Sequence, residues 1–187
     1  MHTTRRLAVA AAIALGGAAA LAGCTAQAGA GASASAEPAA PAVEVAEQNT
    51  VAADRLSAAT AATAAQAALA QCAADGVGYV SVAVVDRNGD LQAFVRGDNA
   101  AAHTIEAARQ KAYTSAAFGA DTSELVERAD ENGLHRLPGA LFMPGGVTVK
   151  LGEASIAGIG VGGAPSGMTD QACAAAGLAA IEQQIEG

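Results

Sequence analysis

Hydrophobic and polar positions after residue 50 follow two periods, one typical of helices and one typical of strands. The stretch 50–74 is rich in alanine, lacks glycine and proline, and is followed by Asp75-Gly76, which predicts a long helix with a glycine stop. Two apolar, β-branched segments come next, at 78–85 and 91–96, with Asn88-Gly89 between them. This pattern predicts a β-hairpin.

The second half of the chain repeats the change from helix to strand. A helical pattern covers 101–119, and a further short helix is predicted from 121 to 131. A loop rich in glycine and proline occupies 138–146. Beyond it, 147–150 and 154–161 read as strands around a turn at Gly152, with room for a third strand.

A final helix is predicted from residue 171 to about 185, with Thr169 and Asp170 as its cap. The predicted order is therefore helix, two strands, two helices, two or three strands, helix. Strands joined by tight turns form antiparallel sheets, and the helices must cover the faces of that sheet. The pattern predicts an α+β domain and argues against a parallel nucleotide-binding fold.

The N-terminus has the three parts of a bacterial export signal. Arg5 and Arg6 precede an uncharged run from 7 to 22, and the sequence Leu-Ala-Gly-Cys at 21–24 resembles a lipobox. We expect cleavage before Cys24 and attachment of lipid to its thiol. An uncleaved membrane helix is the alternative, but the run is shorter and less apolar than the roughly 20 residues that a span needs. Two arginines fit both the general secretory and the twin-arginine route, so the export route stays open.

The residues after Cys24 have the composition of a linker. Alanine, glycine, serine, proline and glutamate dominate up to residue 49, and they cannot bury enough apolar surface to offset the entropy of ordering. The predicted organisation is a signal peptide at 1–23, a disordered tether at 24–49 and one domain at 50–187. The protein would then lie on the outer face of the cell membrane, held by its lipid.

Charge and motifs exclude several classes of function. The net charge of −8 argues against nucleic acid as a partner. The sequence contains no zinc pattern of histidine and cysteine, no phosphate-binding loop ending in Gly-Lys and no nucleophile elbow. The glycines at 158–163 imitate a dinucleotide motif, but they follow a predicted hairpin strand, so we do not interpret them in that way.

Cysteine usage predicts one disulfide. If lipid occupies Cys24, then Cys72 and Cys173 remain as a pair in a compartment that permits disulfides. A bond between them requires the first and last helices of the domain to pack side by side. The alternative is two buried free thiols on alanine-rich helices.

Six segments form an ordered set of motifs along the domain: VAVVDRNG at 82–89, RGDNA at 96–100, ARQKAYTS at 108–115, PGG at 144–146, IAGIGVGG at 156–163 and TDQ at 169–171. Together they resemble the GlcG/HbpS family of haem-binding proteins, which is related to the C-terminal domain of PduO-type proteins. The resemblance implies a sheet of about five antiparallel strands flanked by helices on both faces, assembly into homo-oligomers, and haem binding in some members. Val147-Thr148 and Gly162 depart from the usual pattern.

One face of the helix predicted at 101–119 carries candidate ligand-binding residues. At 100° per residue, His103, Gln110, Lys111 and Thr114 share this face. If it borders a cleft covered by the loop at 144–146, Lys111 and Thr114 would meet a ligand. Lys111 or Arg96 would then pair with a carboxylate such as a haem propionate. A solvated helix face is the alternative interpretation.

Few side chains could bind haem iron. The candidates in the domain are His103, His135, Tyr79, Tyr113, Met143 and Met168. A haem site must use one of these or a weak oxygen ligand, and the candidates that we favour are His135, before the loop at 138–139, and His103. An isolated surface histidine is the plainer interpretation of each. Arg96 and Asp98 are also expected to form a structural ion pair.

Three functions are compatible with these features. The first is a non-enzymatic lipoprotein that captures or senses haem outside the membrane, together with a membrane sensor or transporter. The second is slow oxidative degradation of haem, which needs an open coordination position on the iron. The third is an oligomeric scaffold or partner-binding module for a membrane protein, which needs only the fold.

Overall fold

A computed structural model describes residues 42–185 of the chain. The predicted signal peptide, the lipidation site Cys24 and most of the predicted tether lie outside the described residues. The chain divides into two units, 1–44 and 45–187, and the second is described below. It contains a short 3₁₀ helix, η1 (Glu47–Asn49), before the packed domain.

The domain is built on a four-stranded antiparallel sheet with the order β2-β1-β4-β3. The strands are β1 (Ser81–Asp86), β2 (Leu91–Arg96), β3 (Gly146–Leu151) and β4 (Ala154–Gly162). In the central pair, Val82 aligns with Val161 and Val84 with Ile159. The predicted α+β class is confirmed, with four strands in the sheet where about five were expected.

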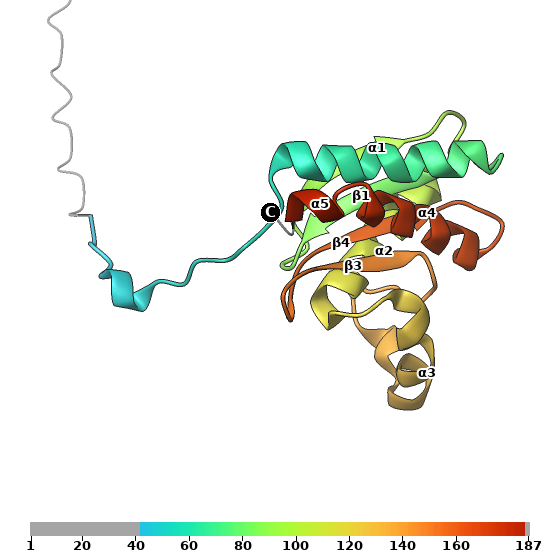
Figure 1. Cartoon of the computed structure of the whole chain (residues 1–187). Coiled ribbons are helices and arrows are strands. Elements are labelled where there is room, and N and C mark those ends of the chain that lie inside the picture. The colour runs from blue at the N-terminus through green and yellow to red at the C-terminus, as the bar shows by residue number, and fades with distance from the viewer. Residues whose placement is uncertain (1–41, 186–187) are drawn as a thin grey trace, which may run out of the picture. The chain divides into compact units, whose positions relative to one another are not determined.

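Helices cover both faces of the sheet, as Figure 1 shows. On one face, α1 (Ala58–Ala74) and α4 (Gly167–Ala179) lie side by side, and α5 (Glu182–Ile185) follows α4. On the other face lies α2 (Ala102–Phe118). Between α2 and β3 the chain makes an excursion that contains α3 (Thr122–Asn132) and the 3₁₀ helix η2 (Leu134–Arg136).

Strand periodicity divides the core into two layers. Val82 and Val84 contribute to the layer beneath α1 and α4, whereas Ala83 and Val85 contribute to the layer beneath α2. The α2 layer is built from small side chains, because α2 presents alanines to the glycines of β4. Little side-chain volume therefore separates this helix from the sheet.

Two helices begin at positions other than those predicted. α1 begins at Ala58 and not at residue 50, because the Ser57 hydroxyl caps it by accepting a hydrogen bond from the Thr60 N–H at 3.1 Å. α4 begins at Gly167, where the Ser166 hydroxyl accepts a hydrogen bond from the Met168 N–H. The prediction of Thr169 and Asp170 as the cap was wrong. The helix predicted at 171–185 is also interrupted after Ala179.

The predicted disulfide is present. Cys72 of α1 and Cys173 of α4 are bonded, with their Cα atoms 5.4 Å apart and a sequence separation of 101 positions. The alternative of two free thiols is therefore wrong. In the chain-entropy model, closing a loop of this length stabilises the fold by on the order of 4 to 5 kcal/mol.

None of the helices found in residues 42–185 combines the length and the apolar character needed to cross a bilayer.

Candidate functional site

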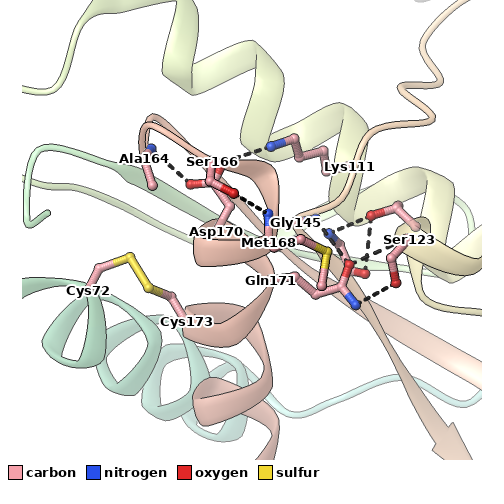
Figure 2. A network of polar contacts seen from close by, with 12 residues as sticks. Cys72, Lys111, Ser123, Gly145, Ala164, Ser166, Met168, Asp170, Gln171 and Cys173 are labelled. Carbon is pink, nitrogen blue, oxygen red and sulfur yellow. Dashed lines mark hydrogen bonds and ion pairs between the residues drawn. A yellow bond between two sulfur atoms is a disulfide. The ribbon is translucent and has the colours of Figure 1, made fainter. Parts of the chain in front are cut away.

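A buried ion pair joins the helices on opposite faces of the sheet. Lys111 of α2 and Asp170 of α4 are 4% and 2% exposed, and the Lys111 Nζ lies 2.8 Å from the Asp170 Oδ2. The other carboxylate oxygen, Oδ1, accepts a hydrogen bond from the Ala164 N–H at 3.0 Å. Figure 2 shows both contacts. The pair thus also fixes the loop before α4.

The next residue of α4 makes a second set of polar contacts. The Gln171 Oε1 accepts hydrogen bonds from the backbone N–H groups of Ser123 and Gly145, each at 3.3 Å. Its Nε2 donates to the Ser123 hydroxyl at 2.7 Å. We call Lys111, Ser123, Asp170 and Gln171 the α4 hub (Figure 2). It connects α2, α3, α4 and the loop before β3.

That loop, at 143–146, lies directly against Lys111. Gly145 has a φ of +128°, and a Cβ at this position would be 2.7 Å from the Lys111 Nζ and 2.8 Å from the Val161 carbonyl oxygen. Only glycine fits such a conformation and such an approach. Lys111 is therefore enclosed by protein on the side where a ligand was expected.

The predicted polar face of α2 divides between the interior and the surface. Thr114 is fully buried; its hydroxyl donates to the Gln110 carbonyl and accepts from the Leu141 N–H. His103 is exposed. The solvated-face interpretation therefore fails for Lys111 and Thr114. A ligand would reach either residue only if the covering loops moved, and their ligand-binding roles stay predictions.

The two predicted iron ligands lie at opposite ends of α2. His103 is in the first turn of α2, whereas His135 packs edge-on against Phe142, which in turn packs against Phe118 at the end of α2. Residues 103 and 118 are separated by about 22 Å along the helix at ~1.5 Å per residue. One subunit therefore cannot use both histidines on one iron.

His135 also has a partner of its own, because its Nε2 lies 2.7 Å from the Asp130 carboxylate. Among residues 42–185, no group of three or more histidine, cysteine or acidic side chains is arranged to hold a metal ion.

The expected pair between Arg96 and Asp98 is not formed, and this prediction is corrected. The Arg96 Nε donates to the Ala100 carbonyl at 2.9 Å, and its Nη2 donates to the same oxygen. The chain turns between Gly97 and Ala100, with Asn99 in the left-handed region at a φ of 62°. This turn places the Ala100 carbonyl, not the Asp98 carboxylate, against the guanidinium.

Arg96 lines a cleft of the size of a small-molecule site. We call it the Arg96 cleft; its volume is about 430 Å³, and it is lined by Leu69, Ala73, Gly78, Tyr79, Arg96, Gly97, Asp98 and Asn99. Small-molecule sites typically occupy roughly 300–1,000 Å³. The cleft combines a guanidinium, a phenol that is 42% exposed and an apolar wall from α1.

A smaller cleft lies along the middle of α2. Its volume is about 220 Å³, and we call it the Arg109 cleft. It is lined by Asn88, Gly89, Glu106, Arg109, Gln110, Tyr113 and Gly139. Arg109 is already paired loosely with Glu106 at 3.9 Å, so its charge is partly neutralised. This cleft is below the usual size for a small-molecule site.

The start of α3 carries a perturbed carboxyl group. Burial raises the pKa of Asp121 above its ordinary value of 3.8, and the neighbouring Glu124 acts in the same direction. The Thr148 N–H, which donates to this carboxylate at 3.0 Å, opposes the shift. A raised pKa means that the folded state holds the proton more tightly. The stability that protonated Asp121 contributes is therefore fully present below its ordinary pKa of 3.8, and it is lost as the pH rises through the raised pKa of the folded state.

The class of fold is an α+β domain in which a four-stranded antiparallel sheet lies between two helical layers. Residues 56–179 match the family model described as "Haem degrading protein HbpS-like". The chain belongs to this HbpS-like family. No curated protein sequence matches this chain.

Solved structures agree with this assignment. The crystal structure of HbpS is 42% identical and superposes with a TM-score of 0.70, covering 73% of this chain and 97% of that one. A double mutant of HbpS from Streptomyces reticuli has the same identity and a TM-score of 0.72, covering 76% of this chain and 97% of that one. The PduOC complex with haem is 27% identical at a TM-score of 0.63, covering 68% and 96%.

Proposed function

We propose that this protein binds haem outside the cytoplasm, with its lipid on Cys24 holding it at the membrane. The observation that carries the haem proposal is the Arg96 cleft, in a chain whose family is described as haem-degrading and whose structural relatives include a haem complex. The cleft offers a cation for a propionate, a phenol for iron and an apolar wall for the porphyrin edge.

Arg96 is oriented for binding a carboxylate. Its Nε and Nη2 are held by the Ala100 carbonyl, which fixes the plane of the guanidinium at the surface. Further N–H groups of the same guanidinium can donate to a propionate, and such charge-assisted hydrogen bonds are stronger than neutral ones. In this proposal Arg96 sets the orientation of the haem.

Two side chains at this end of the molecule could bind the iron. Tyr79 lines the cleft, and His103 lies in the first turn of α2, directly after the loop that forms the rim of the cleft. Both phenolate and imidazole bind haem iron in proteins. Only one edge of a porphyrin would fit into the Arg96 cleft. We therefore propose that a second copy of the chain, in a homo-oligomer, covers the rest of the porphyrin.

A haem titration of the domain, followed by Soret absorbance and sedimentation, tests the proposal. Replacing Arg96 with alanine should weaken binding about tenfold or more, since a hydrogen bond to a charged group contributes about 1.5–3 kcal/mol. The matched control is Arg109→Ala, which removes an exposed arginine from the other cleft and should leave the affinity unchanged.

Each other outcome has a definite meaning. Without a saturable Soret shift in the parent protein the haem proposal fails, and a stable oligomer would then favour the partner-binding scaffold. Weaker binding in Arg109→Ala alone would move the site to the Arg109 cleft. Single variants Tyr79→Phe, His103→Ala and His135→Ala identify the iron ligand by the change in the Soret band. An effect of His135→Ala alone would place the haem at the opposite end of α2.

Oxidative degradation of haem is the second candidate, because it is the activity that the family description names. Haem would then be the substrate, and the iron would need one free coordination position for oxygen. A single protein ligand, from Tyr79 or His103, would leave that position open. Loss of the Soret band with appearance of a bile pigment, under a reductant and oxygen, would distinguish degradation from simple binding.

The location outside the cytoplasm is supported by the Cys72–Cys173 disulfide, because such bonds persist in oxidising compartments. We expect the full chain, expressed in a bacterium that processes lipoproteins, to incorporate a labelled fatty acid and to sediment with membranes. Cys24→Ser should abolish both results, while a conservative change in the preceding apolar run should not. An exported parent chain without label would contradict the lipid anchor.

A further inference from the structure

Three residues within one turn of α4 hold four other parts of the fold. Asp170 is paired with Lys111 of α2, Gln171 bonds to Ser123 and to the loop before β3, and Cys173 is bonded to α1. Figure 2 shows the disulfide one turn along α4 from the hub. A displacement at Cys173 is therefore transmitted along one rigid helical turn to the hub.

The disulfide is the strongest attachment of this end of α4. In the N-terminal half of the helix, the buried side chains are Asp170, Cys173 and Ala174, none of which is a large apolar group. Farther along, a Cβ on Gly177 would be 2.7 Å from the Ala64 carbonyl, so α1 and α4 meet there almost backbone to backbone. A large apolar side chain that is fully buried, Ile181, follows only after the C-terminal end of α4. Loss of the disulfide would thus loosen the N-terminal end first.

The hub depends on the position of that end. A buried ion pair is favourable only when its geometry is good and its remaining polar atoms are bonded. The same helical turn holds the loop at 163–166 through the Ala164 N–H and the loop at 143–146 through the Gly145 N–H. Met143 of the loop at 143–146 and Met168, in the first turn of α4, are 52% and 57% exposed. A loosened hub would release both methionines.

We propose that the Cys72–Cys173 disulfide is a thiol-sensitive lock on the α4 hub, and that its reduction frees the loops at 143–146 and 163–166 while the sheet stays folded. A dithiol supplies two electrons and two protons: the S–S bond breaks, each cysteine sulfur takes up one proton, and the dithiol becomes a disulfide. Both cysteines are fully buried, so a reductant reaches them during transient openings of the start of α4, and reduction then makes the open state persist.

Hydrogen exchange followed by mass spectrometry tests the lock on the whole processed chain, oxidised or treated with dithiothreitol. Reduction should raise exchange at least tenfold in 143–146 and 163–173, and change it less than twofold in β1 and β4. The double variant Cys72→Ala/Cys173→Ala should show the reduced pattern and no response to dithiothreitol, which controls for other effects of the reagent. If that variant does not fold, reduction of the folded parent still provides the result.

A separate variant tests whether the hub transmits the effect. Lys111→Met, with its disulfide intact, should raise exchange in the same two segments, and reduction should then add little. The proposal is overturned if reduction raises exchange uniformly, including β1 and β4, since the disulfide would then act only on global stability. It is equally overturned if reduction leaves both loops protected, or if Lys111→Met leaves them unchanged.

Discussion

Replacing Gly160 with alanine is expected to destabilise the domain by more than about 4 kcal/mol, enough to threaten folding altogether in a domain of ordinary stability. A Cβ on Gly160 would be 2.1 Å from the Ala108 carbonyl oxygen and 2.4 Å from the Ala112 nitrogen. Both are backbone atoms of α2, so no side-chain rotation relieves the clash. α2 would have to lift from the sheet along the layer that it buries.

Urea unfolding followed by circular dichroism measures this effect. Gly158→Ala should behave in the same way, because its Cβ would be 2.1 Å from the Ala112 carbonyl oxygen. The matched control is Gly78→Ala, whose Cβ would make only ordinary contacts, at 3.4 Å from Ala73. We expect the control to stay within about 1 kcal/mol of the parent. Gly160→Ala with near-parental stability would refute the close approach of α2 to β4.

The glycines of β4 show what the sequence could and could not predict. Alternate glycines in a strand mark a close approach of another backbone, and that signal was present at 158, 160 and 162. The sequence interpretation used these glycines as part of a family segment and rejected them as a nucleotide motif, but it did not predict the close approach of α2. The order of elements followed from periodicity, which is a property of the local chain. The Cys72–Cys173 bond followed from the cysteine count, which is a property of the composition.

The environment of Lys111 could not be predicted from its helix alone. Projection at 100° per residue shows which residues share a face, but it does not show what covers that face. Lys111 and Thr114 are buried by the segments around residues 141–146 and by α4, which come from about 30 to 60 residues later in the chain. The family segments pointed to Lys111 as important, and its partner Asp170 was misread as a helix cap.

The separation of His103 and His135 could have been predicted. His103 lies near the start of the helix predicted at 101–119 and His135 comes after its end, and a helix of that length spans about 28 Å. Arg96, in contrast, lies on a cleft whose walls come from α1, the segment before β1 and the turn after β2. Such a cleft depends on packing across the sheet, which no local pattern contains.

Replacing Lys111 with methionine should cost about 3–5 kcal/mol, because it leaves the Asp170 carboxylate buried without its partner. Methionine keeps the length and apolar stem of lysine, so the loss reports on the charge and not on an empty cavity. The matched control is Lys150→Met, which changes the exposed lysine of β3 and should stay within about 0.5 kcal/mol of the parent.

A double variant separates the ion pair from the rest of the hub. Asp170→Asn removes the negative charge and can still accept the Ala164 N–H. Lys111→Met/Asp170→Asn should therefore recover part of the stability lost in Lys111→Met, with a coupling of about 1–3 kcal/mol in a double-mutant cycle from urea unfolding. Purely additive losses would show that the two charges do not depend on each other. The pair would then not be what holds α4 against α2, and the hub would rest on Gln171 and its contacts with Ser123 and Gly145.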